Sequence, residues 1–267
     1  MLILGQCFGN VAANTAKCSK CGGLNLNVAE KGELSVIDYS DKLYCMIRTL
    51  LIFGLIFQFG CQPIVQTEAL EPKVSSEIFI RIIKTTPTKD KGVLQIWKQR
   101  EAGRFVLDRS FDICTWSGKL GPKLREGDGQ SPEGFYYIRP ASLNPNSSYH
   151  LSFNLGFPNA YDRAHRRTGS FLMVHGECVS IGCYAMTNDG IEEIYADVEA
   201  AFAGGQSFIR VHIFPFEMTS ENLTQMSSSH NFPFWRNLKQ GWDWFEREKR
   251  PPNVTVSDRA YVFEDSE

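Results

Sequence analysis

A histidine and a cysteine stand eight positions apart, directly after a short apolar run. We predict that residues 171–174 form a buried strand, which would hold His175 rigidly at its end while Gly176 lets the backbone turn away. Cys183 follows Gly182, so no side chain at the preceding position blocks the approach of a substrate carbonyl. A thiol becomes a useful nucleophile at neutral pH when a base stands beside it, and His175 is the natural base.

Backbone N–H groups around Gly182 and Cys183 are expected to point at one spot and to form an oxyanion hole. The alternative interpretation is structural. In that case Cys183 is a small buried apolar residue and His175 is a hydrogen-bonded histidine of the core. One cysteine and one histidine alone do not decide between the two interpretations.

Two motifs extend this pair. The first reads HGECVSIGCYAMT from His175 onward, and the second reads GPKLREGDGQSPEGFY from Gly121 onward, with Ser131 at a position where threonine is commoner. Taken in their order along the chain, with the motif from Gly121 before the motif from His175, they resemble the signatures of the YkuD family, the L,D-transpeptidase catalytic domain. The motif from His175 resembles the YafK-type branch of that family. The resemblance covers roughly residues 77–217.

The resemblance implies a β-rich α+β fold, a YkuD-like β-sandwich with flanking helices in a single domain. It implies that Cys183 attacks a carbonyl of a peptidoglycan stem peptide and forms a thioester, while His175 takes the thiol proton and the backbone carbonyl of Gly176 orients the imidazole. The acceptor is then an amine, giving transpeptidation, or water, giving hydrolytic release of a diaminopimelate-linked peptide or protein. No metal or cofactor is needed.

Several alternatives stay open. Ile181 occupies a position at which many transpeptidases of the family have histidine, so transfer and hydrolysis are both retained. A secreted cell-wall-binding module without catalysis is a different class of function. A disulfide joining Cys178 or Cys114 to Cys183 would make the thiol structural.

Five residues are expected to contact the substrate. Lys123 and Arg125 lie in the glycine-rich loop of the second motif and are candidates for binding stem-peptide carboxylates. Tyr161 lies in a polar-aromatic turn, and Arg163 begins a cluster of cations before the predicted strand, where the loop should return near the thiol. Ser180 stands three residues before the thiol.

Composition excludes one class of partner. The chain has 267 residues, of which 43% are apolar and 22% charged, with a formal net charge of -2. A nucleic-acid-binding protein would show a basic face or stripe, so we expect no nucleic-acid partner. The membrane is expected as a partner only through the leader described next.

A secretory leader is predicted at residues 46–61, where a basic start precedes a short apolar run and a cysteine. Residues 1–45 would then be a non-native or disordered extension, and residues 62–76 a linker. Lipidation of Cys61 is the less favoured outcome. A zinc site formed by Cys18 and Cys21 with Cys7 and Cys45 is a rival interpretation of the N-terminal cysteines. We expect a periplasmic or envelope location.

Alternating and helical patterns predict the elements around the site. Residues 77–116 are expected to form a β-meander without a helix, and further strands are expected at 135–139, 149–155 and 207–214, the last with a structural His212. A helix should begin at the cap residues 187–189 and end at Gly204. The catalytic domain is assigned to residues 77–217, and residues 218–267 are expected to be a helical extension packed on it, with a short strand at 254–256.

Overall fold

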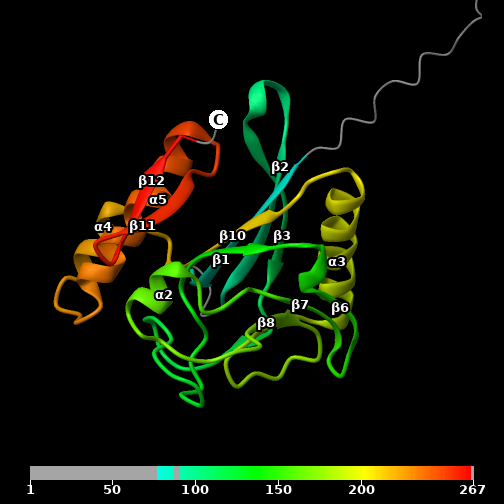
Figure 1. Ribbon diagram of the computed structural model, residues 1–267, viewed down its shortest axis with the longest axis horizontal. Coiled ribbons are helices and arrows are strands. Elements are labelled where there is room, and N and C mark those ends of the chain that lie inside the picture. The colour runs from blue at the N-terminus through cyan, green and yellow to red at the C-terminus, as the bar shows by residue number, and fades with distance from the viewer. Residues whose placement is uncertain (1–76, 87–90, 266–267) are drawn as a thin grey trace, which may run out of the picture. The chain divides into compact units, whose positions relative to one another are not determined.

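Five strands rich in buried aliphatic and aromatic residues form the larger of two main sheets. The computed structural model describes residues 77–86 and 91–265 (Figure 1). The strands are β1 (Ile78–Thr85), β2 (Val93–Gln99), β3 (Phe105–Asp112), β5 (Gly134–Ile138) and β10 (Ile209–Phe216). Their order in the sheet is β3-β2-β1-β10-β5. The pair β1 and β10 is parallel, whereas the other neighbours are antiparallel.

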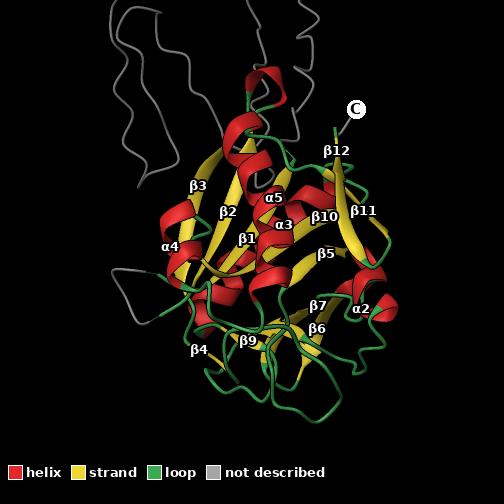
Figure 2. Ribbon diagram, turned by 90° about the vertical axis from the view of Figure 1, so that its left-hand side faces the viewer, coloured by secondary structure: helices red, strands yellow, loops and turns green. Residues whose placement is uncertain are grey.

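The second sheet carries the predicted catalytic residues. Its strands are β4 (Thr115–Trp116), β6 (Leu143–Ser147), β7 (His150–Asn154), β8 (Met173–His175) and β9 (Tyr184–Ala185), in the order β4-β9-β8-β7-β6. Figure 2 shows the larger sheet with its strands side by side and this second sheet below it. The strands β8 and β9 are short and parallel. His175 is the last residue of β8, and Cys183 immediately precedes β9.

One core is shared by both sheets and by the helix α3 (Asn188–Ala203). Alternate residues of β1, Ile80 and Ile82 among them, face this core because successive side chains of a strand point to opposite faces. The helix begins where Thr187 Oγ1 accepts the N–H of Gly190 at 3.1 Å. Its buried side chains recur at helical spacing, as predicted.

The other face of the larger sheet is covered by α5 (Phe232–Glu248) and a C-terminal hairpin (Figure 1). Here Arg81 points away from the shared core and lies over the ring of Trp242 at 4.4 Å. The hairpin consists of β11 (Asn253–Ser257) and β12 (Ala260–Glu264). The remaining elements are α2 (Ala160–Ala164), α4 (Ser220–Gln225) and the 3-10 turns η2 (Glu101–Gly103) and η3 (Pro140–Ser142).

The predicted β-rich α+β fold in a single domain is confirmed. The meander is confirmed as well, except that a 3-10 turn, η2, joins β2 to β3. The strand predicted at 171–174 is wrong in its first half. Phe171 has φ 55° and its side chain is 73% exposed, so the strand begins only at Met173. The hairpin partner β12 and the short helices α2 and α4 were not predicted.

Several predictions lie outside the described residues. They are the extension 1–45 with the zinc alternative at Cys18 and Cys21, the leader 46–61 with the lipid on Cys61, and the linker 62–76. Within residues 77–86 and 91–265, no helix is long and apolar enough to cross a membrane.

Candidate active site

Two parallel strands bring the predicted histidine and cysteine together. β8 ends at His175, and β9 begins one residue after Cys183. The register pairs Val174 with Tyr184 and His175 with Ala185. Val174 and Tyr184 are fully buried in the core, so the residues that flank them point to the opposite face. Cys183, which immediately precedes β9, and His175, which ends β8, therefore lie toward the same face of the sheet.

The imidazole of His175 is held in one orientation. Its Nδ1 lies 2.6 Å from the carbonyl oxygen of Gly176, the group expected to orient it. Because a carbonyl only accepts hydrogen bonds, Nδ1 carries the proton and Nε2 keeps a free lone pair. The ring of Tyr149 packs on the imidazole with 4.9 Å between centroids. Burial lowers the pKa of His175, so the ring is neutral and basic at Nε2 at neutral pH.

Gly176 is required where the chain leaves β8. A Cβ atom at this position would lie 2.6 Å from Asn188 Oδ1 and 3.1 Å from the carbonyl oxygen of Tyr149. That amide oxygen of Asn188 accepts the N–H of Glu177 at 2.9 Å, so it cannot move without losing a bond. The glycine thus lets the turn pack closely against the start of α3.

The thiol of Cys183 is half-buried and is the free thiol of the described chain. The N–H of Met173 donates to Sγ at 3.4 Å, and the carbonyl oxygen of Phe171 lies 3.7 Å from Sγ. Burial raises the pKa of Cys183, while the Met173 N–H and the charge of Lys123 partly offset that effect. The sulfur therefore rests as a thiol at neutral pH and needs a base to become a nucleophile.

Two hydroxyl groups hold the peptide carbonyl of Cys183. Ser180 Oγ donates to this oxygen at 2.8 Å, and Ser131 Oγ donates to it at 2.9 Å. The N–H of Gly182 in turn donates to Ser180 Oγ at 3.2 Å. Gly182 has φ 143°, a conformation that favours glycine. The turn that presents the thiol is thus fixed from both sides.

Two expected roles change because of this turn. The N–H of Gly182 is directed at Ser180 Oγ, so it is not free to stabilise an oxyanion as expected. Ser180 uses its hydroxyl within the turn and not toward a substrate, as serine side chains close to a turn often do. The N–H of Cys183 itself makes no hydrogen bond within the described part of the chain, so it is the candidate oxyanion donor.

A disulfide joins Cys114 to Cys178, with 5.2 Å between their Cα atoms. The alternative in which either of them pairs with Cys183 is therefore wrong. Cys178 lies in the loop between His175 and the thiol, and Cys114 precedes β4 at the edge of the same sheet. The bond ties this loop to the sheet and leaves the thiol of Cys183 unpaired.

Comparison with known proteins agrees with the two motifs. Residues 100–213 match the sequence model of YkuD, the L,D-transpeptidase catalytic domain. The chain is 44% identical over 226 residues to the "Putative L,D-transpeptidase YafK" of Escherichia coli strain K12, covering 83% of this chain and 89% of that protein. The counterpart from Escherichia coli O157:H7 matches with the same values. The chain belongs to the YkuD family.

Two solved structures match this YkuD chain at low similarity. The helical cell shape determining protein Pgp2 from Campylobacter jejuni gives a TM-score of 0.40 at 19% identity, covering 68% of this chain and 74% of Pgp2. Bd1075 from Bdellovibrio bacteriovorus gives 0.37 at 14% identity, covering 70% and 84% of the two chains.

The two candidates in the glycine-rich loop of this YkuD domain differ in exposure. Lys123 is 4% exposed, and its ammonium lies 2.5 Å from Asp128 Oδ1 and 3.0 Å from the carbonyl oxygen of Arg125. The ammonium of Lys123 is bound within its own loop, so the structure does not leave it exposed for the expected contact with a substrate carboxylate. The side chain of Arg125 is exposed beside it. Arg125 is thus the cation of this loop that a substrate can reach.

The structure does not bring Tyr161 and Arg163 to the thiol. Tyr161 is 4% exposed and stacks on Tyr261 of β12, with 4.2 Å between centroids. The guanidinium of Arg163 donates to the carbonyl of Pro158. Both residues line a cavity of about 370 Å³ under the C-terminal hairpin, which includes neither His175 nor Cys183. The unpredicted strand β12 is the reason, because its Tyr261 stacks on Tyr161, which was expected to line the cleft.

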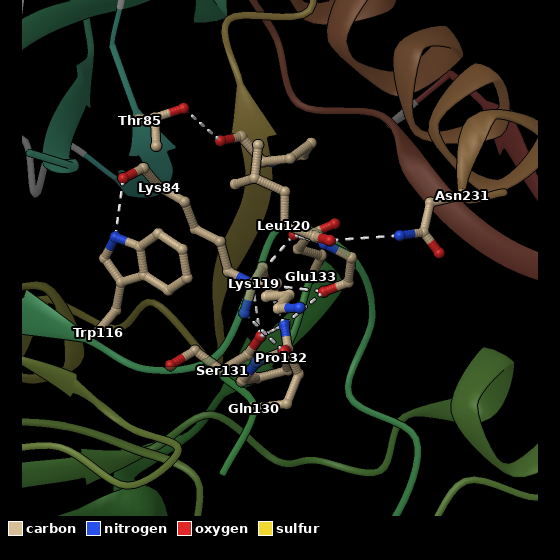
Figure 3. Close-up of polar contacts among 12 residues, drawn as sticks. Lys84, Thr85, Trp116, Lys119, Leu120, Gln130, Ser131, Pro132, Glu133 and Asn231 are labelled. Atoms are coloured by element: carbon tan, nitrogen blue, oxygen red, sulfur yellow. Dashed lines mark hydrogen bonds and ion pairs between the residues drawn. The ribbon is translucent and has the colours of Figure 1, made fainter. Parts of the chain in front are cut away.

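Sequence reasoning missed a group of buried polar residues that reaches the turn of Cys183 through Ser131. Lys84 and Glu133 are fully buried, and Lys84 Nζ lies 2.9 Å from Glu133 Oε1 (Figure 3). Lys84 Nζ also donates to the carbonyl of Ser131 at 2.6 Å. The only signal was the position of Ser131 and Glu133 within the second motif, since the lysine at the end of an apolar strand reads as an ordinary surface residue.

Proposed function

We propose that this protein is a cysteine acyl enzyme that acts on peptidoglycan stem peptides. The proposal is carried by the unpaired thiol of Cys183 on the same sheet face as a histidine whose Nε2 is free to take a proton. Membership of the L,D-transpeptidase family supplies the substrate class.

The proposed reaction begins from a neutral pair. When a stem-peptide carbonyl arrives, His175 Nε2 takes the proton of the thiol, and Sγ of Cys183 forms a bond to the carbonyl carbon. The negative charge moves to the carbonyl oxygen, where the N–H of Cys183 would stabilise it; one such donor contributes about 3 kcal/mol in other enzymes. Collapse breaks the bond to the leaving amine, which takes the proton from the imidazolium, and a thioester remains.

The second half of the reaction has two possible acceptors. An amine would form a new peptide bond, whereas water would release a diaminopimelate-linked peptide or protein. In either case Nε2 takes a proton from the acceptor and returns it to the leaving thiolate. Exposed apolar side chains surround the thiol loop, with Phe171 73% and Ile181 91% exposed. Together with Arg125 they would bind the donor chain through apolar contacts and a carboxylate.

The proposed location is the periplasm or cell envelope. The disulfide between Cys114 and Cys178 supports an oxidising compartment, since cytosolic thiols stay reduced. With it we retain the proposals that residues 46–61 are the leader, with or without a lipid on Cys61, that residues 77–217 are the catalytic domain, and that residues 218–267 are its extension. Amino-terminal sequencing of the mature protein tests the leader, because a start upstream of Met46 would contradict it.

Digestion of purified sacculi tests the function. We expect the full protein to change the fragments seen by mass spectrometry, with new cross-links for transfer and freed amines for hydrolysis. Cys183→Ala and His175→Ala should abolish the change, while His165→Asn, a histidine hydrogen-bonded to Arg259 far along the chain, should not. If the sacculi are bound but unchanged by the wild-type protein, it is a wall-binding module and the enzyme proposal is wrong.

A further inference from the structure

A buried ion pair lies at the base of the loop that precedes β5. The side chains of Lys84 and Glu133 are both 0% exposed. Burying two charges is costly unless further hydrogen bonds satisfy them, and here they do. Lys84 Nζ donates to Glu133 Oε1 at 2.9 Å and to the carbonyl oxygen of Ser131 at 2.6 Å, and lies 3.4 Å from that of Gly121 (Figure 3). Such a pair fixes the backbone around it.

The carboxylate of Glu133 closes the same loop. Its Oε1 accepts the N–H of Gly121 at 2.7 Å, so residues twelve positions apart meet at one oxygen. Gln130 Nε2 donates to the carbonyl oxygen of Gly121 at 2.9 Å and adds a second tie. The loop between Gly121 and Glu133 therefore has a fixed base although it is rich in glycine.

Ser131 connects this base to the nucleophile. Its carbonyl oxygen accepts from Lys84, and its hydroxyl donates to the peptide carbonyl of Cys183 at 2.9 Å. The same hydroxyl accepts the N–H of Ser117 at 3.1 Å, which sets its direction. One residue thus spans the distance from the buried ammonium to the peptide unit of the catalytic cysteine.

The helix α5 reaches the same carboxylate from the opposite side. The indole N–H of Trp235 donates to Glu133 Oε2 at 2.9 Å, and Trp235 is 2% exposed. Both Lys84 and Trp235 lie outside residues 100–213, the segment that matches the family. The structure therefore continues the site into parts of the chain that the family motifs do not include.

We propose that Ser131, Lys84 and Glu133 are positioning residues for Cys183, and that α5 supports them through Trp235. Holding the carbonyl of Cys183 fixes the peptide plane that follows this residue and restrains its Cα, from which the N–H and Sγ extend. If the carbonyl is released, Sγ leaves the Met173 N–H, and less thiolate forms at a given pH. The effect of these residues on activity rests on the proposed function, whereas their effect on the thiol of Cys183 does not.

The test compares Ser131→Ala with Ser131→Thr. Alanine removes the hydroxyl, so we expect iodoacetamide to alkylate Cys183 about three- to tenfold more slowly at pH 8, with the midpoint of the rate raised by roughly half to one pH unit. Threonine keeps the hydroxyl and should restore the wild-type rate. Circular dichroism and a melting curve establish that each variant is folded. A merely structural role would change the melting temperature without changing the pH midpoint.

A matched pair of tryptophans tests the part played by α5. Trp235→Phe removes the N–H that reaches Glu133 and keeps an aromatic ring in the core. Trp242→Phe changes another buried tryptophan of the same helix, which packs on Phe214 at 5.0 Å between centroids. We expect iodoacetamide to alkylate Cys183 about twofold more slowly in Trp235→Phe than in Trp242→Phe. Equal effects would overturn the role of α5.

The two proposals fail in different ways. If Ser131→Ala and wild type are alkylated with the same rate and pH midpoint, the positioning role is wrong, whatever the activity on sacculi. If alkylation changes as expected while wild-type protein leaves sacculi unchanged, the positioning role stands and the proposed function is wrong.

Discussion

Breaking the ion pair of Lys84 and Glu133 should destabilise the protein far more than breaking a surface pair. Glu133→Gln keeps the shape of the side chain but removes its charge. Lys84 is then left as a buried ammonium without a counter-charge, since both side chains are 0% exposed. Burial already lowers the pKa of Lys84, and the charge of Glu133 is the largest influence that opposes this effect.

The expected cost is about 3–5 kcal/mol of unfolding free energy, the usual range for removing one partner of a buried pair. In a domain of 150–250 residues, 1 kcal/mol shifts the melting temperature by about 2–4 °C, so the expected loss is roughly 6–20 °C. The double variant Lys84→Met with Glu133→Gln no longer holds an unpaired charge and should recover part of this loss. Recovery is incomplete because Glu133 also accepts from Gly121 and Trp235.

Urea unfolding followed by circular dichroism gives the free energies. The control is Asp243→Asn, which breaks the pair of Lys239 and Asp243 on the surface of α5, where the aspartate is 51% exposed. That change should cost at most about 0.5 kcal/mol. A loss of less than about 1 kcal/mol for Glu133→Gln would refute the reasoning, because the pair would then behave like an exposed one.

Four further predictions concern the site and the disulfide beside it. Because burial lowers the pKa of His175, its base form persists to lower pH, and the acid limb of kcat/KM on stem peptides should have its midpoint below about 6.5. Burial raises the pKa of Cys183, so the iodoacetamide rate should have its midpoint above about 8.5. A thiol midpoint below about 8.5 together with an imidazole midpoint above about 6.5, as in a resting thiolate–imidazolium pair, would contradict both directions. Reduction of the disulfide between Cys114 and Cys178, which are 64 positions apart, should cost about 4 kcal/mol of stability by chain entropy, and a melting temperature unaffected by dithiothreitol would be incompatible with the bond. Gly176→Ala should lower kcat at least about tenfold with KM less changed, since its Cβ would meet Asn188 Oδ1 at 2.6 Å and displace the carbonyl that orients His175. Gly205→Ala, which follows α3 and has φ 101° and nothing within 4 Å of its Cβ, is the control for backbone strain outside the site.

The regular elements were predictable where one local signal dominates. The helix α3 has a threonine cap and buried residues at helical spacing, so its bounds follow from the sequence alone. β12 was missed because a five-residue strand near a chain end has little local pattern, and it is defined by its pairing with β11. Phe171 was predicted to be buried because it is apolar, but its backbone has φ 55° and turns the ring outward beside the thiol.

The residues expected to carry the chemistry were easier to predict than the residues around them. Cys183 and His175 follow from residue type, spacing and motif, because adjacent parallel strands make a short sequence distance into a short spatial one. The substrate contacts at Tyr161 and Arg163 required knowing what covers α2, and that depends on the distant β12. The pairing of Cys114 with Cys178 likewise cannot be read from a count of cysteines, since several pairings are compatible with the sequence.

The buried network matters because the thiol of Cys183 and the imidazole of His175 are both uncharged at rest. An ion pair between a thiolate and an imidazolium would hold both side chains by charge, whereas a thiol and a neutral imidazole attract each other only weakly. Their relative position must then come from the backbone. For His175 it comes from Gly176 and Asn188, and for Cys183 it comes from Ser131 and Ser180. We therefore expect single substitutions among these contacts to lower the rate of acylation more than they lower the affinity for the substrate, because they misplace the reacting atoms without touching the bound chain.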